Sequence, residues 1–236
     1  ALSATGYSRY HSLQASLQRR FSRGYMFNVS YTYSHSIDTF SDEGIYQVQQ
    51  DSTRPELNRG PSDFNRAHRL IGSWSWLLPF HGNVWADGWQ ISGVATIQSG
   101  RPFTVIDSDG SAILFASGDP RPNVVPGVDP LTTGPMSTRV DGYLNPDAFA
   151  SSGVAWGNLG RNTFVGPMQR RLDVTLSKTT PLHGGSSLEL RLEAYNITNT
   201  ASFRNPERDL SDGDFGEITQ TVGGPRVIQL AMKVRF

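Results

Sequence analysis

The chain has 236 residues, enough for one large or two small domains, and its 21 Lys and Arg residues balance its 21 Asp and Glu residues. This balance lacks the basic stripe of nucleic-acid-binding proteins, so we expect no nucleic-acid partner. The absence of cysteine excludes a disulfide framework and a thiolate metal site. No run reaches the roughly 18 apolar residues of a membrane helix, although strands that cross a membrane need no such run.

Seven segments alternate apolar and polar residues with a period of two, which predicts β-strands. In the clearest, Tyr25, Phe27 and Val29 share one face, and Met26 and Asn28 share the other. The pattern therefore predicts an all-β fold of antiparallel strands. The predicted strands are residues 10–21, 25–36, 68–78, 85–99, 170–180, 187–197 and 226–236.

The last predicted strand carries one wholly apolar face and ends the chain on an aromatic residue. Charged, polar or small residues lie between the apolar ones, so the two faces differ throughout. An antiparallel sheet of a soluble protein, packed on a core, would give the same alternation. The apolar residues, counted back from the C-terminus, are Phe236, Val234, Met232, Leu230 and Ile228.

The connections alternate between short and long along the chain. The long ones are rich in Pro, Gly, Asp, Ser and Asn and contain no sustained periodicity. Short turns at one end and long loops at the other are typical of outer-membrane barrels, whose long loops are extracellular. Because long loops in a compact protein are usually functional, we expect these to bind an external ligand, although no ligand-binding residue can be named. They cover residues 39–65, 100–165 and 199–223.

Aromatic residues gather near the ends of the strands that meet the short turns. Aromatic rings with a polar edge favour the lipid–water interface, which predicts a membrane-interface belt there. The alternative is an aromatic cluster in the core of a β-sandwich. The belt comprises Tyr25, Phe27, Trp74, Trp76 and Trp89.

Nine stretches in order along the chain carry a resemblance to a known family. Among them are SYTYSHSID at 30–38, DFNRAHRL at 63–70 and RLEAYNITN at 191–199. The ordered set is similar to the C-terminal part of TonB-dependent outer-membrane transporters. Within them it most resembles the Oar-like receptors, which carry a carboxypeptidase-regulatory-like domain. The other stretches are residues 10–14, 18–24, 88–93, 98–103, 143–149 and 226–236.

The resemblance implies a barrel of about 22 strands closed by an N-terminal plug, in the outer membrane of a Gram-negative bacterium. The chain would supply its last seven strands. The plug and the TonB box would lie in a missing N-terminal part, an expectation that also suits a sequence beginning without Met or a signal peptide.

The implied role is energy-coupled uptake of a nutrient or large solute. The implied partners are outer-membrane lipid, the remaining strands and plug of the parent chain, TonB, and an extracellular ligand of unknown nature. The barrel-assembly machinery is a further implied partner, because in this family it binds the C-terminal alternation that ends here in Phe236.

No motif predicts catalysis, and we expect neither an enzyme nor a cofactor. The five His residues are scattered without metal-ligand spacing, and the Asp-rich segments 107–110 and 209–214 lack the Glu that completes a calcium loop. A surface-exposed or secreted β-sandwich adhesin remains the alternative function, and a hydrolase is more distant. Charged residues on the polar face could pair across strands or line a ligand path. They are Arg171, Asp173, Glu189, Arg191, Glu193, Lys233 and Arg235.

Overall fold

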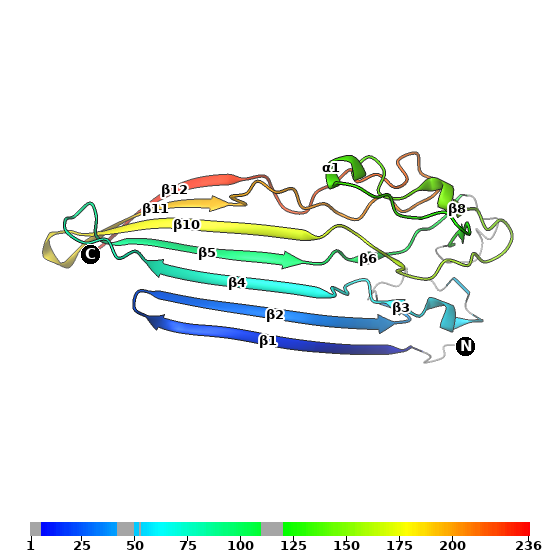
Figure 1. Ribbon diagram of the computed structural model, residues 1–236, viewed down its shortest axis with the longest axis horizontal. Coiled ribbons are helices and arrows are strands. Elements are labelled where there is room, and N and C mark those ends of the chain that lie inside the picture. Colours follow the sequence, from blue (N-terminus) through cyan, green and yellow to red (C-terminus); the bar gives the residue numbers. More distant parts are fainter. Residues whose placement is uncertain (1–5, 42–49, 52, 110–119) are drawn as a thin grey trace.

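The computed structural model describes residues 6–41, 50–51, 53–109 and 120–236. Its seven long strands form one antiparallel sheet in the order of the chain (Figure 1). Each long strand pairs with the next, so the sheet is a meander and the predicted all-β fold is confirmed. The strands are β1 (Ser8–Ser22), β2 (Tyr25–Asp38), β4 (His68–Leu77), β5 (Trp89–Gln98), β10 (Gln169–Pro181), β11 (Ser187–Tyr195) and β12 (Val227–Arg235).

Short elements occupy the connections between the long strands. The strand β3 (Gly60–Pro61) pairs with the end of β2, β6 (Pro102–Phe103) pairs with β9 (Phe164–Val165), and β7 (Asn123–Val124) pairs with β8 (Phe149–Ala150). Among the described residues, no helix is long and apolar enough to cross a membrane. The helical turns are η1 (Pro55–Asn58), α1 (Met136–Arg139), η2 (Pro146–Ala148) and η3 (His183–Gly185).

The two ends of the sheet differ as the sequence predicts (Figure 1). Short turns join β1 to β2, β4 to β5 and β10 to β11 at the end that also holds the C-terminus. The first turn consists of Arg23 and Gly24, whose φ angles of 55° and 85° are those of a two-residue type I′ hairpin. The long connections gather at the other end of the sheet. We call them the loop layer, which consists of the described parts of residues 39–67, 99–168 and 196–226.

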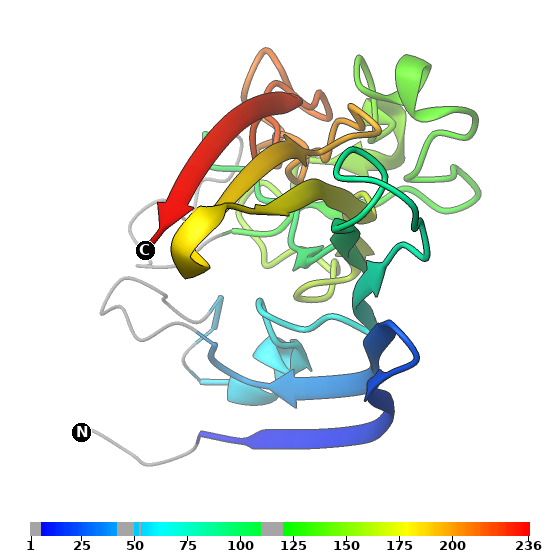
Figure 2. The ribbon, with the colours of Figure 1, turned by 90° about the vertical axis from the view of Figure 1, so that its left-hand side faces the viewer.

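The sheet is a single curved layer. Seen along the strands it follows an open curve with β1 at one end and β12 at the other (Figure 2). A β-sandwich would need two packed sheets, whereas all seven long strands belong to one. This arrangement argues against the adhesin alternative and matches a segment of a barrel wall.

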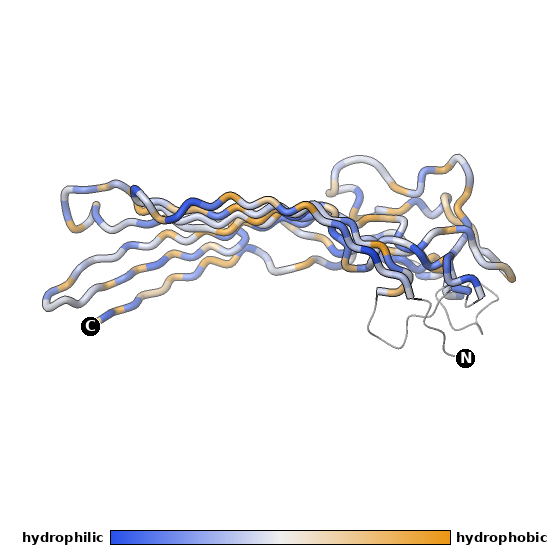
Figure 3. The backbone as a smooth tube through the Cα atoms, turned by 90° about the horizontal axis from the view of Figure 1, so that it is seen from below, coloured by the Kyte–Doolittle hydropathy of each residue, from blue (hydrophilic) through white to orange (hydrophobic). Residues whose placement is uncertain are grey.

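Apolar and polar side chains of this wall separate onto opposite faces, and the tube alternates in hydropathy along the strands (Figure 3). Directly opposed residues of antiparallel strands share a face. Leu230 of β12 pairs with Leu192 of β11, and Met232 pairs with Leu190. Leu230 is 80% exposed and Met232 is 71% exposed. Because contiguous apolar surface of this kind is unfavourable in water, the face is suited to lipid.

The five predicted interface aromatics lie on this apolar face, at the end with the short turns. Tyr25 pairs with Trp76 and Phe27 pairs with Trp74. Trp76 in turn opposes Ile91, which shares a face with Trp89 two residues earlier. The register therefore brings them together on neighbouring strands, and their position at a lipid–water interface stays a prediction.

The predicted start of the fourth strand at Trp85 is wrong. The Asn83 side chain accepts a hydrogen bond from the Trp85 backbone N–H at 3.0 Å, which folds the segment into a turn, so β5 begins at Trp89. Lys178 stabilises this turn from the neighbouring strand, because its Nζ donates to the Val84 carbonyl at 2.7 Å. The Lys178 ammonium also lies 5.6 Å from the centroid of the Trp89 ring, and this cation–π contact stabilises a positive charge on the apolar face.

The sixth strand ends two residues before the predicted Ile197. Asn196 has a φ of 50°, which breaks the strand after Tyr195. The Asn196 backbone N–H donates to Asp173 Oδ1 at 2.7 Å, so a side chain of β10 compensates for the lost ladder bond.

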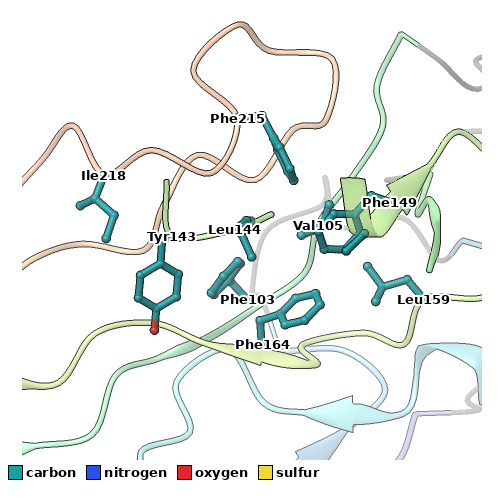
Figure 4. Close-up of a cluster of buried hydrophobic side chains, with 10 residues drawn as sticks. Phe103, Val105, Tyr143, Leu144, Phe149, Leu159, Phe164, Phe215 and Ile218 are labelled. Atoms are coloured by element: carbon teal, nitrogen blue, oxygen red, sulfur yellow. The ribbon is translucent and has the colours of Figure 1, made fainter. Parts of the chain in front are cut away.

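The hydrophobic core lies in the loop layer rather than against the sheet (Figure 4). The Phe149 ring contacts Phe164 and Phe215 edge-on, with centroids 5.7 and 5.6 Å away. Residues of the middle and last long connections thus pack on one another as a small domain would. The cluster consists of Phe103, Val105, Tyr143, Leu144, Ala148, Phe149, Leu159, Phe164, Phe215 and Ile218.

Gly93 of β5 is expected to tolerate no side chain, because the Trp74 indole covers it. An ideal Cβ on Gly93 would lie 2.6 Å from Trp74 Cη2 and 2.8 Å from the Asp173 carbonyl oxygen. Gly93→Ala is expected to lower the free energy of unfolding by about 1–3 kcal/mol, as overpacking does. Urea unfolding in detergent, followed by tryptophan fluorescence, would measure the loss.

Gly72→Ala is the matched control for this substitution. A Cβ there would meet only Val29 Cγ2, at an ordinary 3.8 Å. Equal stability of the two variants would contradict the close packing of Trp74 over Gly93.

Candidate functional site

The three long connections meet in one pocket of about 380 Å³. Thr39 follows β2, Arg101 follows β5 and Arg208 precedes β12, and all three line it. The loops predicted to bind a ligand therefore converge on one place, while their binding role stays a prediction. Other polar residues that line the pocket are Gln50, Asn58, Asp63, Arg121, Arg161 and Asn162.

The polar face of β2 continues into the site. Ser36 and Asp38 follow the period of that face, and both are buried, at 2% exposure each. The Ser36 hydroxyl hydrogen-bonds the Ser62 hydroxyl at 2.8 Å. The rigid strand thus places a carboxylate beneath the pocket.

Arg161 joins the first and middle connections through that carboxylate. Its Nη1 donates to Asp38 Oδ1 at 2.6 Å, and its Nη2 donates to Asp63 Oδ1 at 2.9 Å. The same Nη2 donates to the Ser41 hydroxyl at 2.6 Å. Because charged hydrogen bonds with this forked geometry are strong, the group fixes one wall of the pocket.

Asn162 extends this network in a left-handed backbone conformation, with φ 53°. Its Nδ2 donates to the Pro61 carbonyl at 2.7 Å and to Asp63 Oδ1 at 2.5 Å. Its backbone N–H donates to the Thr104 hydroxyl at 2.8 Å. Asparagine adopts this conformation more readily than most residues, which suits it to the sharp turn after Arg161.

Arg121 is buried beside the pocket, at 3% exposure. Its Nε donates to the Gln50 side chain, and its Nη2 donates to the Leu57 carbonyl at 3.0 Å and to Asn58 Oδ1 at 3.3 Å. These bonds hold Gln50, Leu57 and Asn58 against the segment that leads into β7.

Arg66, Arg69 and Arg101 bring positive charge to the edge of the site. Arg66 Nη1 donates to the Ser99 carbonyl at 2.5 Å, and its Nη2 donates to Gln169 Oε1 at 3.1 Å. Burial lowers the pKa of Arg66, and the positive charges of Arg101 and Arg69 lower it further. An arginine keeps its charge in a protein, so Arg66 remains a cation beside Arg101 and Arg69.

The last connection is tied to the middle one by serines and carboxylates. Asp209 Oδ1 accepts from the Ser108 backbone N–H at 3.1 Å, and Ser211 Oγ donates to Asp107 Oδ1 at 2.9 Å. Backbone bonds between Ile106 and its partners in the last connection continue the pairing. Among the described residues no group of three or more metal-ligating side chains occurs, and the serines occupy the Asp oxygens named here.

Acid is expected to loosen this link. Burial raises the pKa of Asp209, but hydrogen bonds from Ser108 and Ser211 and the charge of Arg208 outweigh it and lower the pKa below the usual 3.8. A carboxylate with a lowered folded-state pKa stabilises the fold above its unfolded pKa and loses that contribution as the pH falls through the folded value. We expect the thermal midpoint of the loop layer to fall below about pH 4.

The measurement is thermal unfolding in detergent at several pH values between about 3 and 6, with Asp209→Asn as the comparison. The Asn variant is expected to lose part of the acid dependence. An unchanged profile in that variant would remove Asp209 from the explanation.

Six of the seven predicted charged residues of the polar face, all but Lys233, form the ion pairs that the described structure shows there. Arg235 of β12 joins Glu189 of β11 at 2.7 Å, a cross-strand pair as predicted. Other pairs join residues two apart on one strand, so cross-strand pairing does not describe them. These are Arg171–Asp173 at 2.8 Å and Arg191–Glu193.

The pocket arginines were not predicted from the sequence. Each stands in a loop segment without periodicity, and the side chains that Arg121 and Arg161 bind come from β2 and the first long connection. The residues of the predicted assembly signal lie on β12, with Phe236 directly after it, and nothing in their geometry tests that role.

These features define a class of protein. A curved antiparallel meander with one apolar face, short turns at one end and long polar loops at the other is the wall of an outer-membrane β-barrel. The family model described as "Outer membrane beta barrel domain" matches residues 1–229, and the chain belongs to this family, whose location is the outer membrane. A search of curated proteins and a search of solved structures found no match.

Proposed function

We propose that the chain is the C-terminal barrel segment of a TonB-dependent receptor of the Oar-like type, in the outer membrane of a Gram-negative bacterium. It binds and transports rather than catalyses. The observation that carries the proposal is the convergence of all three long connections on one polar pocket at the loop end of the wall.

The two free edges of the sheet indicate that the parent protein contains further strands. In the described chain, β1 pairs on one side with β2, and β12 pairs on one side with β11. Unpaired backbone groups in lipid cost several kcal/mol each, so a wall of this kind is stable when further strands close it into a barrel. The parent chain would supply those strands and the plug, and the barrel-assembly machinery would insert them.

The energy-coupling part is tested with the periplasmic domain of TonB. The parent chain, purified in detergent, is expected to bind this domain in a pull-down, and a parent lacking its N-terminal box is expected not to. Equal capture of the two would sink the assignment to TonB-dependent receptors.

The ligand-binding part is tested in the middle connection. Deleting residues 100–165 from the parent receptor is expected to abolish or weaken ligand binding, because this segment supplies Arg101, Arg121 and Arg161 to the pocket. Unchanged affinity would overturn the role of these loops.

A further inference from the structure

The pocket walls carry an excess of positive charge among the described residues. Four arginines line it, Arg101, Arg121, Arg161 and Arg208, against one carboxylate, that of Asp63. Asp63 Oδ1 already accepts hydrogen bonds from Arg161 and Asn162. Its charge is therefore committed within the wall.

Arg101 is the cation that is available to a ligand. It is exposed, and it forms no ion pair with any residue in the part of the chain that the structure describes. Arg161 differs, because Asp38 and Asp63 hold both arms of its guanidinium. The positive charge of Arg66 acts on Arg101 from the edge of the site and adds to the attraction for an anion.

The backbone that carries Arg101 is held firmly. The Gly166 N–H donates to the Arg101 carbonyl at 3.0 Å, and the next residue, Pro102, pairs with Val165. An ideal Cβ on Gly100 would lie 2.9 Å from the Pro167 carbonyl oxygen, so the two segments touch through their backbones. The backbone that carries the cation is therefore preorganised, which limits the entropy lost on binding to that of the side chain.

We propose that the pocket binds an oxyanion of the external ligand, a carboxylate or phosphate group, through Arg101. Guanidinium groups match the geometry of these oxyanions and are weakly hydrated, so they bind them better than ammonium groups do. The inference rests on the proposed function, since it names the ligand class of that same site.

The anion belongs to a dissolved solute rather than to a lipid headgroup. Arg66 donates to Gln169, and Gln169 also accepts from Gln98, which lies opposite Arg69 in the sheet. These residues share the polar face, whereas lipid would cover the other face. The cationic edge of the pocket is therefore continuous with the water-facing side of the wall.

The test is isothermal titration of the parent chain, in neutral detergent at low salt, with citrate and with inorganic phosphate. Binding of at least one anion is expected, with the affinity reduced ten-fold or more in Arg101→Ala and reduced in the wild type by added salt. Arg20→Ala is the matched control, because Arg20 is exposed near the short-turn end of β1 and outside the pocket. This control is expected to bind as the wild type does.

Equal affinity of Arg101→Ala and wild type, or no binding of either anion, would overturn the proposal. A further arm replaces the solutes with micelles that contain phosphatidic acid. Binding confined to these micelles would overturn the assignment to a solute. The titrations contain no TonB, so they are independent of the TonB pull-down. Anion binding by a parent chain that does not capture TonB would refute only the receptor assignment. Capture of TonB by a parent chain that binds no anion would refute only this inference.

Discussion

Replacing Arg161 with alanine is expected to lower the free energy of unfolding of the loop layer by about 3–5 kcal/mol, because a buried carboxylate would lose its partner. The Arg161 guanidinium lies 2.6 Å from Asp38, whose side chain is 3% exposed. Removing the cation leaves that charge in a poorly solvated place, where the pairing with Asp63 and Ser41 is lost as well. Thermal unfolding of the parent chain in detergent, together with limited proteolysis of the loops, would measure the effect.

Two further variants separate charge from geometry. Arg161→Lys keeps the charge but lacks the planar fork, so an intermediate loss is expected. The double variant Arg161→Gln with Asp38→Asn removes both charges and is expected to be more stable than Arg161→Ala, because no unpaired buried ion remains. If Arg161→Ala were as stable as the wild type, the buried pair would not hold the loops together.

The barrel wall could be predicted from the sequence because its pattern is local. A strand that separates lipid from water must alternate at every residue, so the period appears within one segment, as in Leu230 and Met232 of β12. The errors occur where one side chain overrides the pattern. Asn83 folds Trp85 into a turn, and the left-handed Asn196 ends a strand early.

The candidate site could be located only as a set of loops. Its bonds join residues that are far apart in the chain: Arg161 and Asp38 are separated by 123 positions, and Arg121 and Gln50 by 71. No period or short motif encodes such pairs, and a loop arginine has the same sequence context whether it lines a pocket or faces solvent. The long loops themselves were the available signal.

The two parts of the molecule are stabilised by different means. The wall depends on backbone pairing and on lipid covering its apolar face, whereas the loop layer has its own core around Phe149 and a buried ion pair at Arg161. A substitution on the apolar face of the wall should therefore be costly in a bilayer and nearly neutral if that face met water. This difference gives the sharpest test of the membrane assignment.

Leu230→Arg is expected to destabilise the barrel by about 2–4 kcal/mol, the cost of a cation near the bilayer midplane on the lipid face. Leu230 is 80% exposed and lies near the middle of the nine-residue strand β12. In a water-soluble sheet, replacing so exposed a side chain with a charged one would change the free energy of unfolding by no more than about 0.5 kcal/mol. The size of the loss, measured by reversible unfolding of the parent chain in lipid vesicles, therefore reports the solvent of this face.

Gln229→Arg provides the matched control on the adjacent residue of the same strand. Successive side chains of a strand point to opposite faces, so this arginine would lie on the polar face opposite Glu193. A loss near zero is expected there, because the new cation meets water and a carboxylate. A large loss at Leu230 with none at Gln229 would follow from a lipid-facing wall, whereas similar small effects at both positions would contradict it.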